Sequence, residues 1–478
     1  MSRRRVDWPI LAWILLIAGA ALLAYGRSLN VFFSQDDFFF LARADRVESV
    51  ADFVRALAAP DHFYRPVPRV VLFVGALRLF GLNPGAFHLV NLGFHACNAV
   101  LFFLLCRRLS GSTLLAGLAG LFFVSHHIPF LAVYWLSGVQ DLCMTFLALV
   151  GVHTYLLSLR TGRIGWWAIS LLAFALALLS KETAVTLPLT LLLAGIVWQR
   201  RAGRALRKRQ LLLHTVGYAV VLGLYLILRS QKAAAAISDV GPYAWALSPG
   251  VVFKNLYAYL CDTLYVRNWL WTAPQRAAWT CGVFLALVGI LLATCRRHRA
   301  MTALGLAWFV VSLLPLLFLS ERAYSFYGYF ALAGAAIAVG VLPAGALERI
   351  GGSEGSAWPA RQFVGGIVLC LIVGGWLWFS MGQIRTTEAA DPVGILTKSD
   401  IAHRALVECQ ALYPALAHGS TLCVEGLTER DVWAVGRGDM FRLYYPGVTV
   451  LIATELETSG AISSCDGVSY VYRYGGDR

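Results

Sequence analysis

Long runs of apolar residues, separated by short polar loops, recur along most of the chain. A helix needs about 20 such residues to cross the hydrocarbon of a bilayer, where every backbone polar group must be bonded within the protein. The pattern predicts an all-α polytopic membrane protein with about 11 transmembrane helices. The predicted spans are residues 8–26, 86–106, 112–125, 130–158, 166–180, 183–199, 214–230, 277–294, 302–320, 323–344 and 362–381.

Two further apolar stretches contain charged residues and are predicted to lie in the membrane interface. Residues 67–81 include Arg69, and residues 251–269 include Lys254 and Asp262. Charges are costly inside a bilayer but are tolerated where a helix lies along its surface. Both stretches are therefore left out of the predicted spans.

The composition becomes polar near the end of the chain. This change divides the sequence into a membrane domain at residues 1–384, with its first external loop at 27–85, and a small extracytoplasmic α/β domain at residues 385–478. The tail contains one helix-like stretch at 400–413 and strand-like stretches at 421–424, 448–453 and 468–474.

Three cysteines lie in this polar tail: Cys409, Cys423 and Cys465. In an oxidising compartment two of them are expected to form a disulfide and one to stay a free thiol. The pairing favoured is Cys423 with Cys465.

The net charge of +14 is interpreted as a sign of membrane topology, because 59% of the residues are hydrophobic. Basic residues gather in short loops at 107–108, 160–163, 200–209 and 296–299. Such loops are typical of the cytoplasmic side of a membrane. We expect the N-terminal segment to be a retained anchor with its start inside and the C-terminus outside. No nucleic-acid partner is expected, and the predicted location is a bacterial inner membrane.

Polar side chains form stripes on two of the predicted spans. Residues at 3–4 residue spacing share one face of a helix. The two stripes are His88, Asn91, His95 and Asn98 on one span and Tyr134, Ser137, Asp141 and Thr145 on another. They are compatible with a hydrophilic cavity that opens outward, or with hydrogen bonds that hold the helices together.

Candidate chemical groups also gather in the loops predicted on the outer side. They are Asp36-Asp37, Tyr64-Arg65, His126-His127, Lys181-Glu182 and Glu321-Arg322. A solvated helix end explains any one of them, but their common placement favours a site. A carboxylate can accept the proton of an attacking hydroxyl, which contributes ~10²–10⁴ in rate. Fixed cations can neutralise the charge on a departing phosphate.

An ordered series of short motifs resembles the integral-membrane GT-C glycosyltransferases, which use lipid-phosphate-linked sugars. The series is most similar to the branch of the TPR-carrying transmembrane O-mannosyltransferases and their bacterial relatives. Its elements are Asp36-Asp37; Tyr64-Arg65-Pro66-Val67; Gly81-Leu82-Asn83-Pro84; Phe87-His88-Leu89-Val90-Asn91 with His95; Ala132-Val133-Tyr134-Trp135 with Ser137-Gly138; Ser180-Lys181-Glu182; and Glu321-Arg322.

The resemblance implies roles for these residues. Asp36 and Asp37 correspond to the acidic catalytic motif, with Asp36 as the base. The implied donor-phosphate residues are Arg65, Lys181 and Arg322, and His88 and His126 are implied to line the pocket. The predicted substrate site also includes Tyr64, Asn91, Asp141 and Glu182.

The sequence departs from this family in two places. No TPR helices follow the membrane part, so the acceptor class stays open, and His126-His127-Ile128-Pro129 replaces an expected His-Pro pair. No third acidic ligand accompanies Asp36 and Asp37. We therefore expect no cofactor, and we do not expect a divalent cation to be required.

The resulting hypothesis is an inverting glycosyltransferase of the hexosyl or mannosyl type. It would move a sugar from a polyprenyl-phosphate donor to an acceptor hydroxyl on a protein, lipid or glycan, at the extracytoplasmic face. A glycan ligase or polymerase of the same fold is one alternative. A flippase or transporter of a lipid-linked sugar is another, although the acidic pair lies in a loop and we find no repeat of the kind common in transporters.

Overall fold

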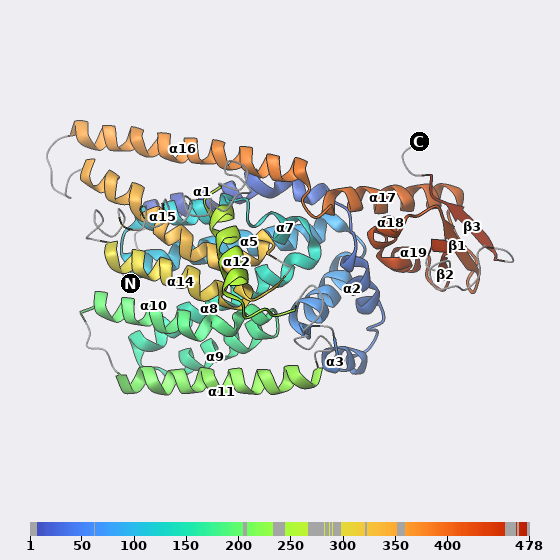
Figure 1. Ribbon diagram of the computed structural model, residues 1–478, viewed down its shortest axis with the longest axis horizontal. Helices are drawn as coiled ribbons and strands as arrows, with labels where there is room; N and C mark the ends of the chain where they lie inside the picture. Colours follow the sequence, from blue (N-terminus) through green and yellow to red (C-terminus); the bar gives the residue numbers. More distant parts are fainter. Residues whose placement is uncertain are drawn as a thin grey trace, which may run out of the picture.

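The computed structural model describes residues 7–61, 63–203, 208–232, 244–265, 282, 286, 289, 298–320, 323–350, 359–454, 465 and 468–475. Its long helices lie side by side, and a smaller unit extends from one end of this bundle (Figure 1). The long helices are α1 (Trp8–Tyr25), α5 (Pro84–Ser110), α6 (Thr113–Ser125), α8 (Val139–Thr161), α9 (Ile164–Leu178), α10 (Leu187–Arg201), α11 (Lys208–Lys232), α14 (Arg299–Leu317), α15 (Tyr329–Ile350) and α16 (Pro359–Ala390).

The structure confirms a helical integral membrane protein. Among the described residues, seven helices are long and apolar enough to cross a bilayer. Two shorter apolar helices, α6 and α9, coincide with predicted spans. Helix α11 covers the predicted span at 214–230, and most of the one at 277–294 lies outside the described residues. The count of about 11 spans stays a prediction.

Helix α5 shows how the sequence sets the ends of a span. The Asn83 side chain accepts a hydrogen bond from the backbone N–H of Ala86 (3.2 Å), and Pro84 occupies the first helical position. Both features favour a helix start. Gly111 follows the helix with φ +61°, a left-handed conformation that favours glycine.

The predicted span at 130–158 is not one continuous helix, and its long helix begins only at Val139. Helix α7 (Phe130–Tyr134) and the turn η3 (Leu136–Gly138) precede α8. The Asn91 side-chain amide donates to the backbone carbonyls of Trp135 (3.2 Å) and Leu136 (3.4 Å). This side chain satisfies carbonyls that the interruption leaves without their usual helical partners.

The basic loops and the acidic pair lie at opposite ends of the bundle. Helix α8 begins beside Ser137, which bonds Asp37, and carries Arg160 in its last turn. Its 23 residues span about 35 Å at 1.5 Å per residue, roughly the thickness of the hydrocarbon layer. Helix α5 likewise ends with Arg107 and Arg108, far from its start.

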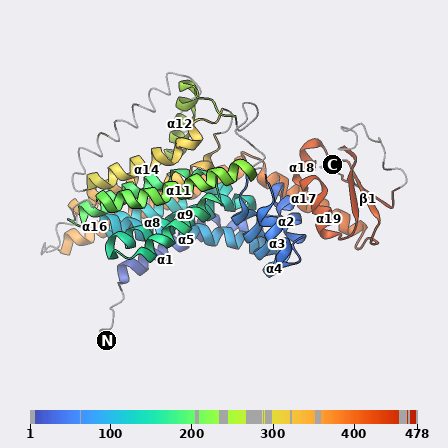
Figure 2. The ribbon, with the colours of Figure 1, turned by 90° about the horizontal axis from the view of Figure 1, so that it is seen from below.

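Short helices cover the end of the bundle that carries the acidic pair. They include α2 (Asp36–Asp45), α3 (Val50–Ala58), η2 (Val67–Leu72) and α4 (Phe73–Phe80), and Figure 2 shows α2, α3 and α4 beside the C-terminal unit. Helix α12 (Pro249–Thr263) runs across the long helices (Figure 1). The stretch at 67–81 and the described part of the stretch at 251–269 are thus mostly helical, and their depth in the membrane stays a prediction.

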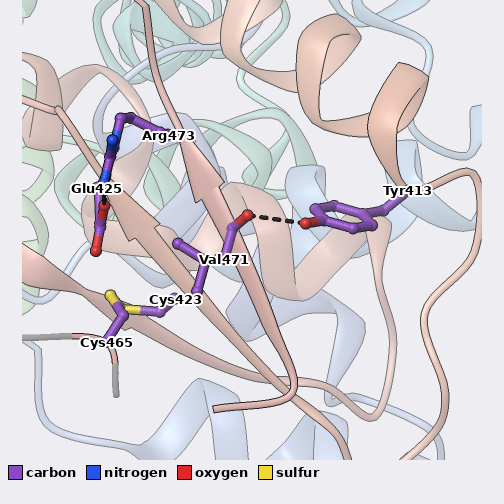
Figure 3. The surroundings of a disulfide bond; sticks show 6 residues. All are labelled: Tyr413, Cys423, Glu425, Cys465, Val471 and Arg473. Atoms are coloured by element: carbon purple, nitrogen blue, oxygen red, sulfur yellow. Dashed lines mark hydrogen bonds and ion pairs between the residues drawn. A yellow bond between two sulfur atoms is a disulfide. The ribbon is translucent and has the colours of Figure 1, made fainter. Parts of the chain in front are cut away.

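The C-terminal unit is the predicted small α/β fold. Its three parallel strands, in the order β2-β1-β3, are β1 (Thr421–Glu425), β2 (Thr449–Ile452) and β3 (Tyr470–Arg473). Its helices are α17 (Ile395–Leu412), α18 (Glu429–Ala434) and α19 (Asp439–Tyr444). Cys423 in the central strand forms a disulfide with Cys465, as favoured from the sequence (Figure 3).

The first external loop and the C-terminal unit share one apolar core. Phe33, Phe38 and Leu41 from the loop belong to the same buried cluster as Ala402 and Met440. Burial of apolar surface is the main source of cohesion between elements. The boundary predicted between residues 384 and 385 falls inside α16 and stays a prediction.

Candidate active site at the acidic end of the bundle

The acidic pair occupies the first turn of α2, where the helix dipole favours carboxylates. Gln35 precedes it with φ +56°, an uncommon conformation for a residue other than glycine. The C-terminal unit holds this turn in place. The Gln35 N–H donates to the Ala434 carbonyl (3.2 Å), and the Phe32 N–H donates to the Ser399 hydroxyl (2.8 Å).

Asp37 is buried and fixed by hydrogen bonds. Its Oδ1 accepts from the Ser137 N–H (2.9 Å) and the Ser137 hydroxyl (2.6 Å), and its Oδ2 accepts from the Ser34 N–H (3.1 Å). Burial raises the pKa of Asp37 to about 7, although these hydrogen bonds favour the charged form. Asp37 therefore ties the acidic turn to η3 of the bundle.

Asp36 is half-buried, and Lys398 of the C-terminal unit lies near it. The Lys398 ammonium donates to the side-chain oxygen of Gln35 (3.3 Å) and to the Val393 carbonyl (3.0 Å). Asp36 is close enough to Lys398 to influence its charge. The Asp36 carboxylate is therefore accessible to solvent, while hydrogen bonds hold the backbone beside it in place.

Arg65 is held in a buried network. Its guanidinium makes a two-pronged ion pair with Glu182, including a 2.8 Å bond from Nε, and it also donates to the side-chain oxygen of Gln140. Burial disfavours its charge, but Glu182 outweighs this cost and the pKa of Arg65 lies above its ordinary value. Arg229 of α11 also approaches Glu182, at 3.7 Å.

Gln140 connects this network to the acidic turn. It accepts from Arg65 and donates to the backbone carbonyl of Ser137 (2.9 Å). Ser137 in turn donates to Asp37. A continuous path of hydrogen bonds therefore joins Arg65 to Asp37 through two residues of the η3–α8 junction.

Lys181 forms a second buried ion pair next to this path. Its ammonium lies 2.6 Å from both carboxylate oxygens of Asp141, the residue after Gln140. It also lies 4.6 Å from the ring centroid of Tyr327, a cation–π contact. The structure thus brings together Asp37, Arg65, Asp141, Lys181 and Glu182 from the predicted set.

The stripe on α5 makes contacts that hold the bundle together. His88 lies 3.4 Å from the Val133 carbonyl, and Asn91 bonds the carbonyls of the η3 turn. His95 bonds the Tyr329 hydroxyl (2.8 Å) and the Val124 carbonyl (2.9 Å). Of the two interpretations of this stripe, the geometry favours interhelical hydrogen bonds. His88 and Asn91 on α5 therefore contact the backbone of the segment that leads into η3.

His126 and Tyr64 also have structural partners. The His126 ring is buried, accepts from the Ile128 N–H (3.2 Å) and lies 3.2 Å from the Thr263 carbonyl. The Tyr64 hydroxyl donates to the Leu57 carbonyl (3.2 Å). Tyr64 adopts φ +51°, which turns the chain just before Arg65. Arg322 lies outside the described residues, so its predicted role stays a prediction.

The described part of the chain contains no group of three or more His, Cys, Asp or Glu side chains able to hold a metal ion. Sequence reasoning missed Gln140, Lys398 and Arg229 as members of the site. Gln140 could have been noticed from its position between Ser137 and Asp141. Neither Lys398 nor Arg229 had a local signal, because contacts with distant segments bring them to the site.

No family model matches the chain. The protein O-mannosyl-transferase TMTC1 of Homo sapiens is 29% identical in an alignment of 194 residues that covers 36% of this chain and 22% of that protein. TMTC1 of Mus musculus is also 29% identical and is matched over 20% of its length. The chain therefore spans about a fifth of the curated relatives it matches.

The fold matches a solved structure over nearly its whole length. ArnT from Cupriavidus metallidurans in the apo state has a TM-score of 0.50 and 15% identity, covering 95% of this chain and 92% of that chain. A second structure of that ArnT, bound to undecaprenyl phosphate, has a TM-score of 0.49 and 15% identity, with the same coverage. The resemblance to GT-C proteins is thus confirmed at the level of the fold.

Proposed function

We propose that this chain, which has a GT-C fold, is a membrane glycosyltransferase that takes a sugar from a lipid-phosphate donor. The acceptor is a hydroxyl presented at the end of the bundle that carries Asp36 and Asp37. The observation that carries the proposal is the hydrogen-bonded path from Asp37 through Ser137 and Gln140 to Arg65. This path fixes an acidic turn relative to buried cations, as a single-displacement transfer requires.

Asp36 is assigned as the general base and Asp37 as the residue that positions it. Asp36 accepts the proton of the acceptor hydroxyl as the acceptor oxygen attacks the anomeric carbon. The bond from that carbon to the donor phosphate breaks, and the phosphate leaves with the electron pair. Attack and departure occur on opposite sides, so the anomeric configuration inverts. Asp37 stays bonded to Ser137 and Ser34 throughout.

Arg65 and Lys181 are assigned to the leaving phosphate. A guanidinium has five N–H donors and an ammonium three. The contacts of Arg65 with Glu182 and Gln140 and of Lys181 with Asp141 leave some of these donors for a phosphate. Fixed donors that act where negative charge develops stabilise the transition state. Glu182 and Asp141 keep the two cations in place before the donor enters.

The name of a relative indicates which donor sugar to test first. TMTC1 is a protein O-mannosyl-transferase, so we propose mannose carried by a polyprenyl phosphate as the donor. The acidic end lies opposite the arginine-rich loops, which supports a reaction on the extracytoplasmic face of the membrane. In a bacterial inner membrane this face is the periplasmic one.

The test compares Asp36→Asn with Asp45→Asn, a control acid at the exposed end of the same helix. Membranes containing each protein receive radiolabelled polyprenyl-phosphate mannose, and transfer to endogenous acceptors is measured. Loss of the base is expected to slow transfer by ~10²–10⁴, whereas the control retains it. Wild-type rates in Asp36→Asn would remove Asp36 as the base. Translocation of the donor by the wild type without transfer would favour the flippase alternative.

A further inference from the structure

A pocket of about 490 Å³ lies between the membrane bundle and the C-terminal unit. It is formed by the turn between α16 and α17, by α18 and by the segment before η6 (Ser325–Gly328). Its lining residues are Tyr324, Asp391, Pro392, Val393, Gly394, Lys398, Arg430 and Trp433. None of these residues belongs to the site described above, apart from Lys398 and Val393, which approach the acidic turn.

Two cations converge in this pocket. A Cβ atom placed on Gly394 would lie 3.3 Å from a guanidinium nitrogen of Arg430 and 3.9 Å from the Lys398 ammonium. Burial, together with the positive charge of Arg430, lowers the pKa of Lys398, although the carboxylates of Asp391 and Asp36 act in the opposite direction. No ion pair joins Arg430 to a carboxylate within the described residues, so an anionic ligand would relieve the repulsion between the two cations.

Asp391 is the carboxylate among the lining residues, and its oxygens are already committed. One accepts from the Leu396 N–H (3.2 Å), and the other accepts from the N–H (2.9 Å) and the hydroxyl (2.8 Å) of Thr397. Asp391 therefore caps the start of α17. The Arg430 charge is left available to a ligand.

Two aromatic side chains complete the pocket. The Trp433 side chain is 47% exposed, and the Arg437 guanidinium lies 4.9 Å from its ring centroid. Tyr324, which precedes η6 of the membrane bundle, also lines the pocket and is half-buried. Flat aromatic faces beside a few polar groups are suited to the apolar face of a sugar ring. A small inorganic anion would need only the two cations and not the aromatic side chains.

The pocket is connected to the acidic turn. Lys398 donates to Gln35, the residue before Asp36, and the Gln35 N–H donates to Ala434, the residue after Trp433. A ligand bound between Lys398 and Trp433 therefore ends next to Asp36.

We propose that this pocket binds the acceptor, and that the acceptor is a saccharide carrying a phosphate or carboxylate group. This inference rests on the proposed function. Arg430 and Lys398 pair with the anionic group, Trp433 and Tyr324 pack against the ring, and a ring hydroxyl is directed toward Asp36. The saccharide is either a lipid headgroup or a soluble glycan, since both present the same chemistry.

The test measures binding of glucose 6-phosphate to the purified full-length protein in phosphatidylcholine nanodiscs, with no donor present. Glucose and inorganic phosphate are the comparison probes. Arg430→Gln is expected to weaken glucose 6-phosphate binding about tenfold, as loss of a charge-assisted contact does. The control Arg473→Gln removes an exposed arginine of β3 that pairs with Glu425 of β1, and it is expected to leave binding unchanged.

Equal affinities of the wild type and Arg430→Gln would overturn the inference, as would phosphate binding as tightly as glucose 6-phosphate. Asp36→Asn separates this result from the proposed function, because it is expected to lose transfer and retain binding. Nanodiscs doped with a phosphoinositide distinguish the source of the ligand. If the phosphoinositide competes with glucose 6-phosphate, the ligand is a lipid headgroup. If glucose 6-phosphate still binds equally well in the doped nanodiscs, the ligand is a soluble glycan.

Discussion

The strongest quantitative prediction concerns the buried carboxyl of Asp37. Its pKa is raised by burial from 3.8 to about 7. In the folded protein Asp37 therefore keeps its proton to a higher pH than in the unfolded chain. Asp37→Asn removes this titration and keeps an oxygen that can accept from Ser137.

The sign of the effect follows from proton linkage. Between pH about 4 and 7 the unfolded chain has lost this proton while the folded protein retains it, so the contribution of Asp37 to stability falls as the pH rises. The difference between 3.8 and about 7 corresponds to roughly 4 kcal/mol. Above pH about 7 both states are ionised, and the contribution no longer changes.

The assay is equilibrium unfolding in mixed detergent micelles at pH values from 4 to 8. The free energy of unfolding of Asp37→Asn is subtracted from that of the wild type at each pH, which cancels the titration of groups common to both. This difference in free energy of unfolding, wild type minus variant, is expected to fall by several kcal/mol between pH 4 and 7. The Asp45→Asn variant provides the baseline for removing an acid from α2.

A difference that does not vary with pH would refute the reasoning, because it would mean that Asp37 titrates alike in both states. A difference that grows in favour of the wild type as the pH rises would refute it too. That result would show that the hydrogen bonds from Ser137 and Ser34 outweigh burial.

Two further predictions test how the site is held. Arg65→Ala is expected to lower kcat/KM for the lipid-phosphate donor about tenfold with membrane insertion intact. Arg55→Ala, which removes an exposed arginine of α3, serves as its control in the same kinetic assay. An unchanged kcat/KM would remove Arg65 from the phosphate site. Gly436→Ala is expected to destabilise the fold by roughly 2 kcal/mol or more and to lower transfer, because Gly436 has φ +58° and a Cβ there would lie 2.6 Å from the Phe38 Cβ. Gly419→Ala is the control, because Gly419 also has a positive φ (+80°) but a Cβ there would contact no other atom. Equal losses of thermal stability and of transfer in the two variants would show that the contact with Phe38 is unimportant.

Much of the fold could be predicted from local sequence patterns. Apolar length identified the long helices, and the strand-like stretches at 421–424, 448–453 and 468–474 lie within about two residues of the observed strands. The distribution of arginines separated the two ends of the bundle. These features depend on composition over a short window, which the bilayer and the sheet impose directly.

The partners of the candidate site residues could not be predicted in this way. The periodicity of His88, Asn91 and His95 placed them on one face of a helix, but it did not show that carbonyls of α6 and the η3 region face them. The same limit applies to Gln140, which links Arg65 to Ser137. Which groups meet across helices depends on packing between distant segments, and no short window contains it.

The core shared by the first loop and the C-terminal unit has a consequence for biosynthesis. The backbone of Phe32 bonds Ser399, 367 positions later, and the buried contacts of Phe33 and Phe38 include residues that follow Ser399. Chains leave the ribosome from their N-terminus, so the acidic turn is made long before the groups that anchor it. A polypeptide that ends before Ser399 and Ala434 therefore lacks the groups that hold its acidic turn in place.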